Sequence, residues 1–241
     1  MRPGYYKLII FVSKYMAKEK KPVVQINGIS FLRIPIKTRV ITEKDNIVEV
    51  IDEYTHDLRQ NNDIIVVSES VVAITQGRAI PVDKIKVGIL AKILWRFVRK
   101  VPYGIGLRSP TSMQCAINEV GSFRITVAAI IGGIARFFGR KGDFYRIAGE
   151  QAAMIDAAHT SPIEPYNKCV IMGPKDPMCV AKKIKEKIKC DAAVVDVNDI
   201  GGSWAVGYTD GINRKLLEDI MRDNPLGQKL EQTPIGIIRK V

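Results

Sequence analysis

The stretch CVIMGPKDPMCVAKKIKEKIKCDAAVVD, residues 169–196, carries the clearest structural pattern in this chain of 241 residues. Residues 169–172 form a short apolar run, and a turn rich in proline and glycine follows them. Residues 178–189 place apolar side chains at helical spacing, and residues 192–196 are a second apolar run. A strand, a helix and a strand with short links predict a βαβ unit with a parallel pair and a right-handed crossover. The predicted fold class is therefore α/β.

Elements of both kinds precede this unit. Residues 46–58 carry apolar side chains at helical spacing behind Asp45, which is expected to cap the helix. Residues 63–68 read as a buried strand that runs on toward residues 71–78. Residues 84–101 alternate apolar and basic residues with helical period, which is typical of an ordinary surface helix and also of a helix lying on a membrane.

Three more elements are expected around or after the unit. A helix should begin near Thr111 or Ser112 and end just before Gly121, after a loop over residues 102–110. Residues 213–223 predict another helix, and residues 235–238 a last short strand. With no internal repeat, the chain is divided into an N-terminal extension, residues 1–28, and one domain, residues 29–241.

The composition limits the classes of partner. Lys and Arg number 37 against 25 Asp and Glu, which gives a net charge of +12, so anions such as nucleotides, nucleic acid, acidic metabolites or a membrane surface are attracted. A generally basic surface with no particular anionic partner explains the net charge equally well. The longest near-apolar run, residues 125–135, is too short to span a membrane. With no signal-peptide pattern and four scattered cysteines, we expect a cytoplasmic protein with reduced thiols.

Metal chemistry is limited by the side chains available. Only two histidines are present, His56 and His159, so a multi-histidine site is excluded. A metal would be bound mainly by oxygen, which favours magnesium or manganese over zinc. The sequence also lacks a phosphate loop of the form G-x-x-x-x-G-K-[ST] and a G-x-S-x-G elbow.

Polar residues at the ends of predicted strands are the candidate site. Asp196 and Asn198 are two apart and therefore point to the same face at the carboxyl end of a strand, where open α/β sheets bind ligands. A metal or phosphate role and a simple turn cap before Gly202 both fit this pair. Asp156 lies among small residues that leave room for a ligand, or it caps a turn. Arg78, at the end of the presumed strand, suits a phosphate or carboxylate, or is merely solvated.

Five segments together resemble the deazaflavin coenzyme (coenzyme F-420) gamma-glutamyl ligase family, in order and rough spacing, from about Ile29 to the C-terminus. They are IPIKTR (34–39), DIIVVSESVVAITQGR (63–78), IDAAH (155–159), GPKDP (173–177) and AVVDVND (193–199). The resemblance implies mixed sheets with helices, an intertwined homodimer, and GTP with manganese or magnesium used to join glutamate to a carboxylate through an acyl-phosphate.

The resemblance also implies roles by position. Asp156 and Asp196 correspond to the metal-binding aspartates, with Asn198 as a further ligand or a neighbour of one. The nucleotide would be bound by residues at strand ends and turns, whereas the catalytic residues stay unassigned. These expected nucleotide contacts are Lys37, Thr38, Arg39, Glu69, Ser70, Gly77, Arg78 and His159.

The chain departs from the family pattern at several positions. Ile74 stands where a lysine is expected, Val197 where a hydroxyl would help to bind metal, and His159 where an asparagine is expected. The C-terminal phosphate segment, residues 231–235, is altered, and a basic insertion lies around residues 88–146. These departures indicate a divergent relative rather than the deazaflavin enzyme itself.

The leading hypothesis is an amide ligase dependent on a nucleotide, GTP or ATP, and on Mg²⁺ or Mn²⁺, with an unknown acceptor. The alternative is a non-catalytic relative of the same fold that binds an anionic partner, a nucleotide or nucleic acid, through its basic surface. Nucleic acid is the less favoured partner because aromatic and basic residues are not interleaved as in RNA-binding motifs. The deazaflavin ligase itself is a third reading.

Overall fold

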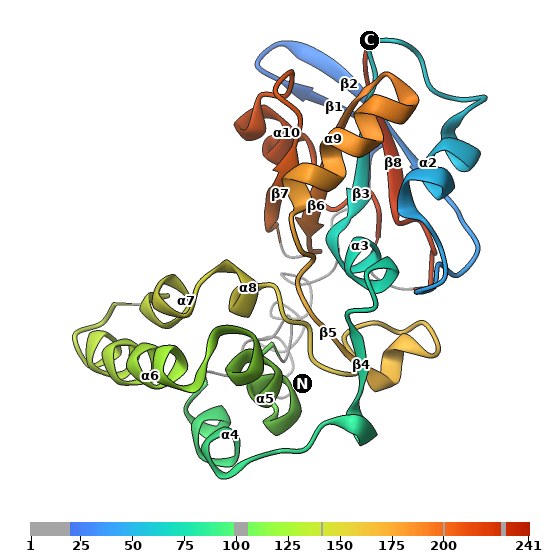
Figure 1. The fold of residues 1–241 in the computed structure, drawn as a ribbon. Coiled ribbons are helices and arrows are strands. Elements are labelled where there is room, and N and C mark those ends of the chain that lie inside the picture. Colours follow the sequence, from blue (N-terminus) through green and yellow to red (C-terminus); the bar gives the residue numbers. More distant parts are fainter. Residues whose placement is uncertain (1–19, 99–105, 141, 200, 228–229) are drawn as a thin grey trace, which may run out of the picture.

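The computed structural model describes residues 20–98, 106–140, 142–199, 201–227 and 230–241. Figure 1 shows two lobes, one built around a sheet and one built from helices. The two-stranded sheet of β4 (Ala79–Pro81) and β5 (Cys169–Ile171) lies where the lobes meet. Three short 3-10 turns accompany these elements, at Val82–Lys84, Trp95–Phe97 and Tyr166–Lys168.

The sheet lobe is organised by six strands, which confirms the α/β class with mixed sheets. Their order is β1 (Val23–Ile26), β2 (Ile29–Ile36), β8 (Ile235–Lys240), β3 (Ile64–Ser68), β6 (Asp191–Val197) and β7 (Ser203–Tyr208). β3 and β6 are parallel, and the other neighbours are antiparallel. The C-terminal strand β8 is thus inserted between β2 and β3.

An Asn-Gly turn joins β1 to β2. Asn27 and Gly28 both have positive φ, 51° and 78°, as a tight hairpin turn requires. Because Val23–Ile26 pairs with residues 29–32, the expected extension over residues 1–28 ends inside a hairpin. The division of the chain into extension and domain stays a prediction.

Helices cover both faces of the sheet because alternate strand residues point to opposite sides. On one face α2 (Ile47–Thr55), α3 (Glu69–Thr75) and α9 (Pro177–Ile188) close a core that contains Ile65 and Val67. On the other face α10 (Arg214–Ile220) packs over Val66.

The first turn of α9 lies directly against β7 at Gly207. A Cβ on Gly207 would stand 2.3 Å from the backbone carbonyl of Pro177, so Gly207→Ala is expected to lower the free energy of unfolding by roughly 1–3 kcal/mol. Gly133 in helix α6 (Ser122–Phe137) is the matched control, because a Cβ there meets nothing within 4 Å. Gly133→Ala should stabilise by roughly 0.5–1 kcal/mol. Urea unfolding of both variants measures the contrast, and equal effects would contradict it.

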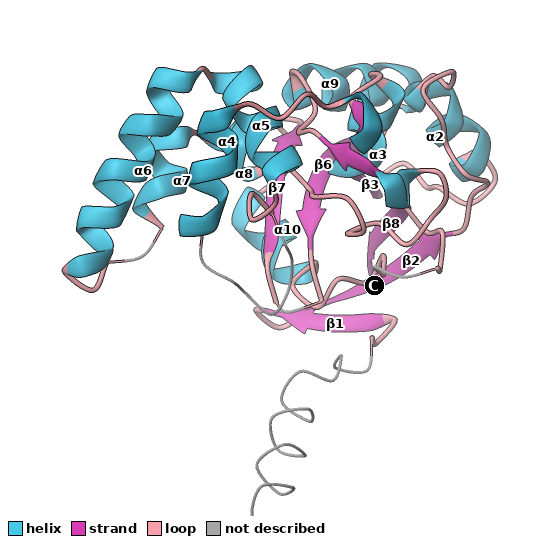
Figure 2. Cartoon of the chain, turned by 90° about the horizontal axis from the view of Figure 1, so that it is seen from below, coloured by secondary structure: helices cyan, strands magenta, loops and turns pink. Residues whose placement is uncertain are grey.

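The helical lobe contains α4 (Ile89–Leu94), α5 (Pro110–Val120), α6, α7 (Asp143–Ala148) and α8 (Glu150–Ala153) around its own core, which includes Met113 and Ile125. Figure 2 shows α6 and α7 side by side at the edge of the molecule. Among the described residues no single helix is long and apolar enough to cross a membrane. α5 and α6 together reach that length and composition, but they meet at a bend of 117°.

The structure corrects the predicted βαβ unit. β5 pairs antiparallel with β4 in the small sheet, whereas β6 lies parallel to β3 in the large one, so the two strands are not a parallel pair. The strands and the helix are present as predicted, but their pairing is decided by segments that are about a hundred residues away along the chain.

Three local predictions were also wrong, in whole or in part. Residues 71–78 do not continue the strand: the chain turns into α3 at Glu69, and Arg78 follows a helix rather than a strand. Asn46, not Asp45, caps α2, with its side chain accepting from the Val48 amide. The helix expected over residues 84–101 is α4, which covers only Ile89–Leu94, and residues 99–105 lie outside the described part. The helix ending before Gly121 is confirmed as α5.

Candidate functional site

The carboxyl ends of β3 and β6 place Glu69 next to Asp196. Ser68 in β3 pairs with Val195 in β6, so the residues that follow each of them lie side by side. Glu69 begins α3 and is 4% exposed, and Asp196 is the second-last residue of β6. This parallel pair is the only one in the described sheets, so the predicted ligand-binding edge lies at these two strand ends.

Asp156 is brought to the same place by the small sheet. Its backbone pairs with that of Ile171: the Asp156 amide donates to the Ile171 carbonyl at 2.8 Å, and the Ile171 amide donates back at 3.0 Å. The Ser70 hydroxyl donates to Glu69 Oε2 at 3.3 Å and also hydrogen-bonds the carboxylate of Asp156. Three carboxyl groups from three separate segments therefore converge.

The pKa values of all three carboxyl groups are raised. Burial raises the pKa of Glu69 well above its ordinary value, and the negative charges of Asp156 and Asp196 raise it further. Burial, followed by repulsion from Asp196, raises the pKa of Asp156 from 3.8 to about 7. Burial alone raises the pKa of Asp196. Glu69 Oε1 is buried without a hydrogen-bond partner among the described residues. Buried carboxylates that repel one another in this way are stabilised when they bind a cation or share a proton.

The three carboxyl groups line one large cavity of about 1330 Å³ between the lobes. Part of its wall is apolar and comes from α4, the turn after it, α6 and α7. These apolar residues are Leu94, Phe97, Val98, Ala129, Gly132, Gly133 and Phe144. This volume exceeds the roughly 300–1,000 Å³ that is usual for a single small-molecule site.

Among the expected nucleotide contacts, Thr38, Arg39, Glu69 and Ser70 line this cavity. Arg39 is held by two hydrogen bonds to Asp45, at 2.9 and 2.6 Å. Of the expected metal ligands, Asp156, Asp196 and Asn198 all line the cavity. The Asn198 side chain accepts from the Gly202 amide at 2.9 Å, so it also caps the turn, as the alternative reading proposed.

Lys37, Gly77, Arg78 and His159 are not among the residues that line the cavity. Arg78 is bound inside the protein: its guanidinium donates to the Gly173 carbonyl at 2.6 Å and to Glu119 at 2.9 Å. Lys37 and His159 are exposed. Nucleotide contacts by these four residues stay predictions.

The sequence did not single out two features of the cavity. Arg136, on α6, lines it and forms no ion pair within the described part of the chain. The interpretation of Glu69 as a nucleotide contact missed that it is the third member of the carboxyl cluster. No motif marks either role, because both depend on elements that meet only in the folded chain.

The carboxyl cluster fits a hard divalent cation that takes its remaining ligands from substrate. Among the described residues, no group of three His, Cys, Asp or Glu side chains is placed so that it could hold a metal ion by itself. Magnesium in particular is bound by one or two carboxylates plus phosphate oxygens and water rather than by an all-protein cage. The oxygen donors of Asp156 and Asp196 and the orphaned Glu69 Oε1 agree with such an open site.

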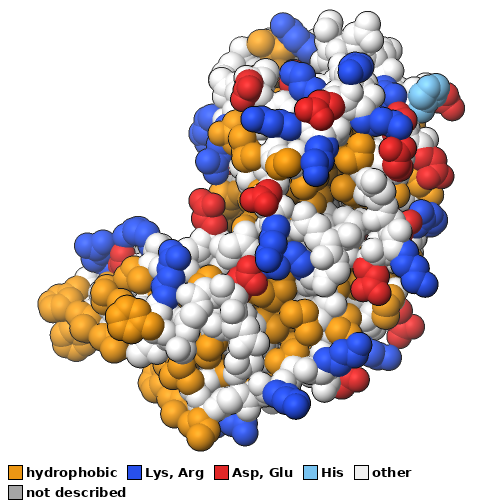
Figure 3. Space-filling model, viewed as in Figure 1, with side chains coloured by type: hydrophobic (Ala, Val, Ile, Leu, Met, Phe, Trp, Pro, Cys, Tyr) orange, Lys and Arg blue, Asp and Glu red, His pale blue; other side chains and the backbone are white. Residues whose placement is uncertain are grey.

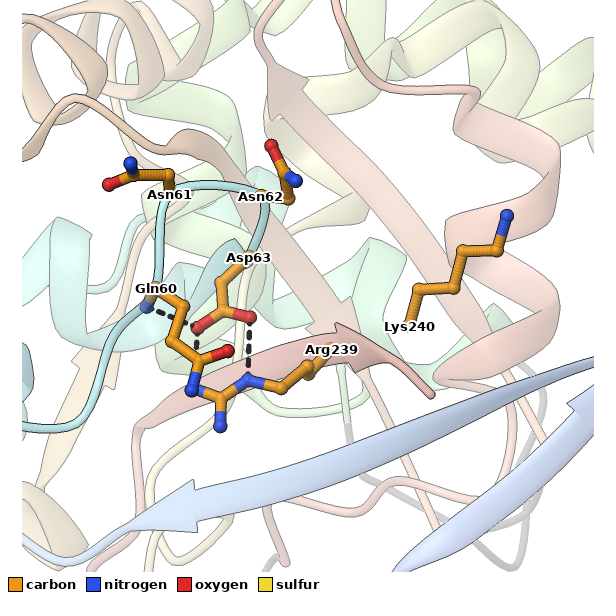
Figure 4. Close-up of a pocket in the computed structure, with 6 residues that line it drawn as sticks. All are labelled: Gln60, Asn61, Asn62, Asp63, Arg239 and Lys240. Atoms are coloured by element: carbon orange, nitrogen blue, oxygen red, sulfur yellow. Dashed lines mark hydrogen bonds and ion pairs between the residues drawn. The ribbon is translucent and has the colours of Figure 1, made fainter.

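A second cavity lies at the opposite end of β3. It has about 550 Å³ and is lined by residues 60–63, Arg239 and Lys240 (Figure 4). Asp63 and Arg239 form two hydrogen bonds there, at 2.9 and 2.8 Å. This pair fastens the end of β8 to the loop before β3, so its charges serve the fold.

A protein-family model described as F420-0:Gamma-glutamyl ligase matches residues 35–238, which include all three carboxyl residues of the cluster. The comparison with curated proteins gave no match.

Proposed function

Because the chain belongs to the F420-0:gamma-glutamyl ligase family, we propose that it is an amide ligase driven by a nucleoside triphosphate and a divalent cation. It would transfer a phosphoryl group to a carboxylate acceptor, and the amine of glutamate or a related amino acid would displace phosphate from that acyl-phosphate. The observation that carries this proposal is the convergence of Glu69, Asp156 and Asp196 on one large cavity.

Asp156 and Asp196 would hold the cation, which is Mg²⁺ or Mn²⁺ by the chemistry of its oxygen donors. When bound, the cation would neutralise negative charge on the triphosphate. Both aspartates are fixed by backbone pairing, Asp156 to Ile171 and Asp196 to Trp204 on β7. Their positions are therefore set before any ligand binds, which is the condition for electrostatic preorganisation.

Glu69 is suited to hold a proton rather than a charge. Burial, and then the charges of Asp156 and Asp196, raise the pKa of Glu69 well above its ordinary value, which favours the protonated carboxyl group. A protonated Glu69 can donate a hydrogen bond to a phosphate or carboxylate oxygen of a substrate. The hydroxyl of Ser70 orients Oε2 for this purpose.

Arg136 is the cation best placed for an anionic substrate. Arg39 is committed to Asp45 and Arg140 to Asp143, whereas Arg136 lines the same cavity without an ion pair among the described residues. A guanidinium binds a carboxylate or phosphate through two parallel hydrogen bonds. Arg136 would therefore bind the acceptor carboxylate or the triphosphate, and the apolar part of the cavity would hold the body of the acceptor.

The proposal is tested by nucleotide binding with and without Mn²⁺. Purified protein is titrated with GTP or ATP analogues by calorimetry, and glutamate-dependent phosphate release is then measured with candidate carboxylates. We expect binding only in the presence of the cation. Asp156→Asn and Asp196→Asn should each weaken that binding by a factor of about 100 or more, since a carboxylate that neutralises the cation is lost.

Asp57→Asn is the matched control, because the Asp57 side chain is 94% exposed and remote from the cavity. It should bind nucleotide and Mn²⁺ like the parent. If the two cavity variants also bind like the parent, the cation is held elsewhere and the site is wrong. If the parent binds no nucleotide with any divalent cation, the chain is not a ligase of this type.

A further inference from the structure

Helix α6 presents an apolar stripe to solvent. Phe123, Val127, Ile130, Ile134 and Phe137 are spaced so that they lie on one side of the helix over a length of about 21 Å. Phe123 is 82% exposed and Phe137 is 87% exposed. An exposed apolar surface this continuous marks an interaction site in a folded protein.

This stripe is not the face that packs in the helical lobe. The buried face of α6 contains Ile125 and Ala128, and Gly132 on the same side touches Phe144 of α7. Helix α6 thus has two apolar faces. One is packed inside the helical lobe, and the other has no packing partner among the described residues. Figure 2 shows the C-terminal end of α6, where Phe137 ends the stripe, projecting beyond α7.

Helix α4 and the turn after it add to the same apolar region. Ile89, Ile93 and Phe97 are 78%, 48% and 72% exposed. Figure 3 shows hydrophobic side chains gathered along the side of the helical lobe where α4 and α6 lie, with basic side chains beside them. We give one name, the apolar rim, to the stripe on α6 together with the exposed apolar residues of α4 and of the turn after it. Its residues are Phe123, the half-buried Val127, Ile130, Ile134, Phe137, Ile89, Ile93 and Phe97.

The charge around the rim is almost entirely positive. The described residues between positions 84 and 142 include eight Lys and Arg and a single acidic residue, Glu119. Glu119 is already paired with Arg78 in the interior. Lys92 lies on α4 and Arg96 on the 3-10 turn that follows it, beside the apolar residues of the rim. Apolar side chains that extend from a basic helix surface are the pattern of helices lying in the interface of an anionic bilayer.

We propose that the apolar rim docks this protein onto the surface of an anionic lipid bilayer, with α6 and α4 in the interface and Lys92 and Arg96 at the headgroups. The charge favours this partner over a second copy of the chain, because a two-fold contact places the same surface against itself and would bring like charges together. The proposal does not rest on the carboxyl cluster, and of the rim residues only Phe97 also lines the cavity.

The test is flotation of the full chain with vesicles of phosphatidylcholine alone and with a third of phosphatidylglycerol. The parent should bind the anionic vesicles at least tenfold more tightly, and 0.5 M salt should release most of it. Phe137→Ser should reduce partitioning about tenfold, because one aromatic side chain no longer enters the interface. Lys92→Gln with Arg96→Gln should reduce it more than tenfold.

Two controls match these variants. Leu58→Ser removes an apolar side chain that is 49% exposed on the sheet lobe, and Lys182→Gln with Lys183→Gln removes two exposed charges on α9. Both should bind vesicles like the parent. Equal binding to neutral and anionic vesicles would overturn the proposal, and so would parent-like binding of Phe137→Ser. Sedimentation in the absence of lipid tests the alternative that a second copy of the chain covers the rim. A dimer that Phe137→Ser converts to a monomer would show that the rim joins two copies, and would overturn the proposal.

Discussion

Replacing Asp156 with asparagine is expected to stabilise the metal-free protein at pH 8 while removing its response to Mn²⁺. The pKa of Asp156 is raised from 3.8 to about 7, mainly by burial and then by the charge of Asp196. Between these two values the folded protein keeps a proton that the unfolded chain has released. The free energy of unfolding therefore falls as the pH rises from about 4 through 7, and a shift of this size corresponds to roughly 4 kcal/mol.

Asparagine carries no charge at any pH, so the variant does not lose this stability above pH 7. We expect the melting temperature of Asp156→Asn at pH 8, in EDTA, to exceed that of the parent by several degrees, and the two to converge at pH 4. Mn²⁺ has the opposite effect on the parent. A cation at a hundred times its dissociation constant stabilises by about 2.7 kcal/mol, and protons compete with it at low pH.

Thermal unfolding at pH 4, 6 and 8, with EDTA or with Mn²⁺, measures both effects. Asp57→Asn is again the control, and its pH profile should follow the parent because its carboxylate is exposed. A metal-free parent that is more stable at pH 8 than at pH 5, together with a destabilised Asp156→Asn, would mean that Asp156 is paired rather than buried and repelled. Functional sites typically contain residues such as this, which serve ligand binding and lower the stability of the ligand-free protein.

Local patterns identified most elements of the sheet lobe. The runs at residues 63–68 and 192–196 and the helical spacing at residues 178–189 are strong because their apolar faces are regular. Strand pairing was not predictable in the same way. β6 takes β3 as its parallel neighbour, and β8 enters between β2 and β3 from the far end of the chain. No local pattern records such pairings, since they depend on the burial of whole faces.

The candidate site was predicted in part for the same reason. Asp156 and Asp196 were expected together, and the structure brings them to one cavity with Glu69. Arg78 was expected to face a ligand, but Glu119, 41 residues further on, pairs with it. The sequence gives the charge of a side chain but not its partner, and only the folded helical lobe places Glu119 within reach.

The second large effect concerns the buried guanidinium of Arg33. Asp223→Ala is expected to destabilise the protein by roughly 3–5 kcal/mol, because it leaves a buried charge without its counter-charge. Arg33 is 2% exposed on β2 and donates to Asp223 Oδ2 at 3.0 Å and to the Ile220 carbonyl at 2.9 Å. Arg33 Nε is buried without a hydrogen-bond partner among the described residues. The described surroundings of the guanidinium therefore offer no spare acceptor that could replace the carboxylate of Asp223.

The same ion pair should respond unequally to loss of its two members. Arg33→Met removes the buried charge and keeps much of the volume, while the Asp223 side chain, 28% exposed, can be solvated. The cost of Arg33→Met should therefore be smaller than that of Asp223→Ala, and Lys215→Ala, at an ion pair whose lysine is 73% exposed, should cost less than about 1 kcal/mol. Urea unfolding of the three variants gives the order. If Arg33→Met proves the most harmful, the guanidinium stabilises the fold by packing and hydrogen bonding rather than depending on the charge of Asp223.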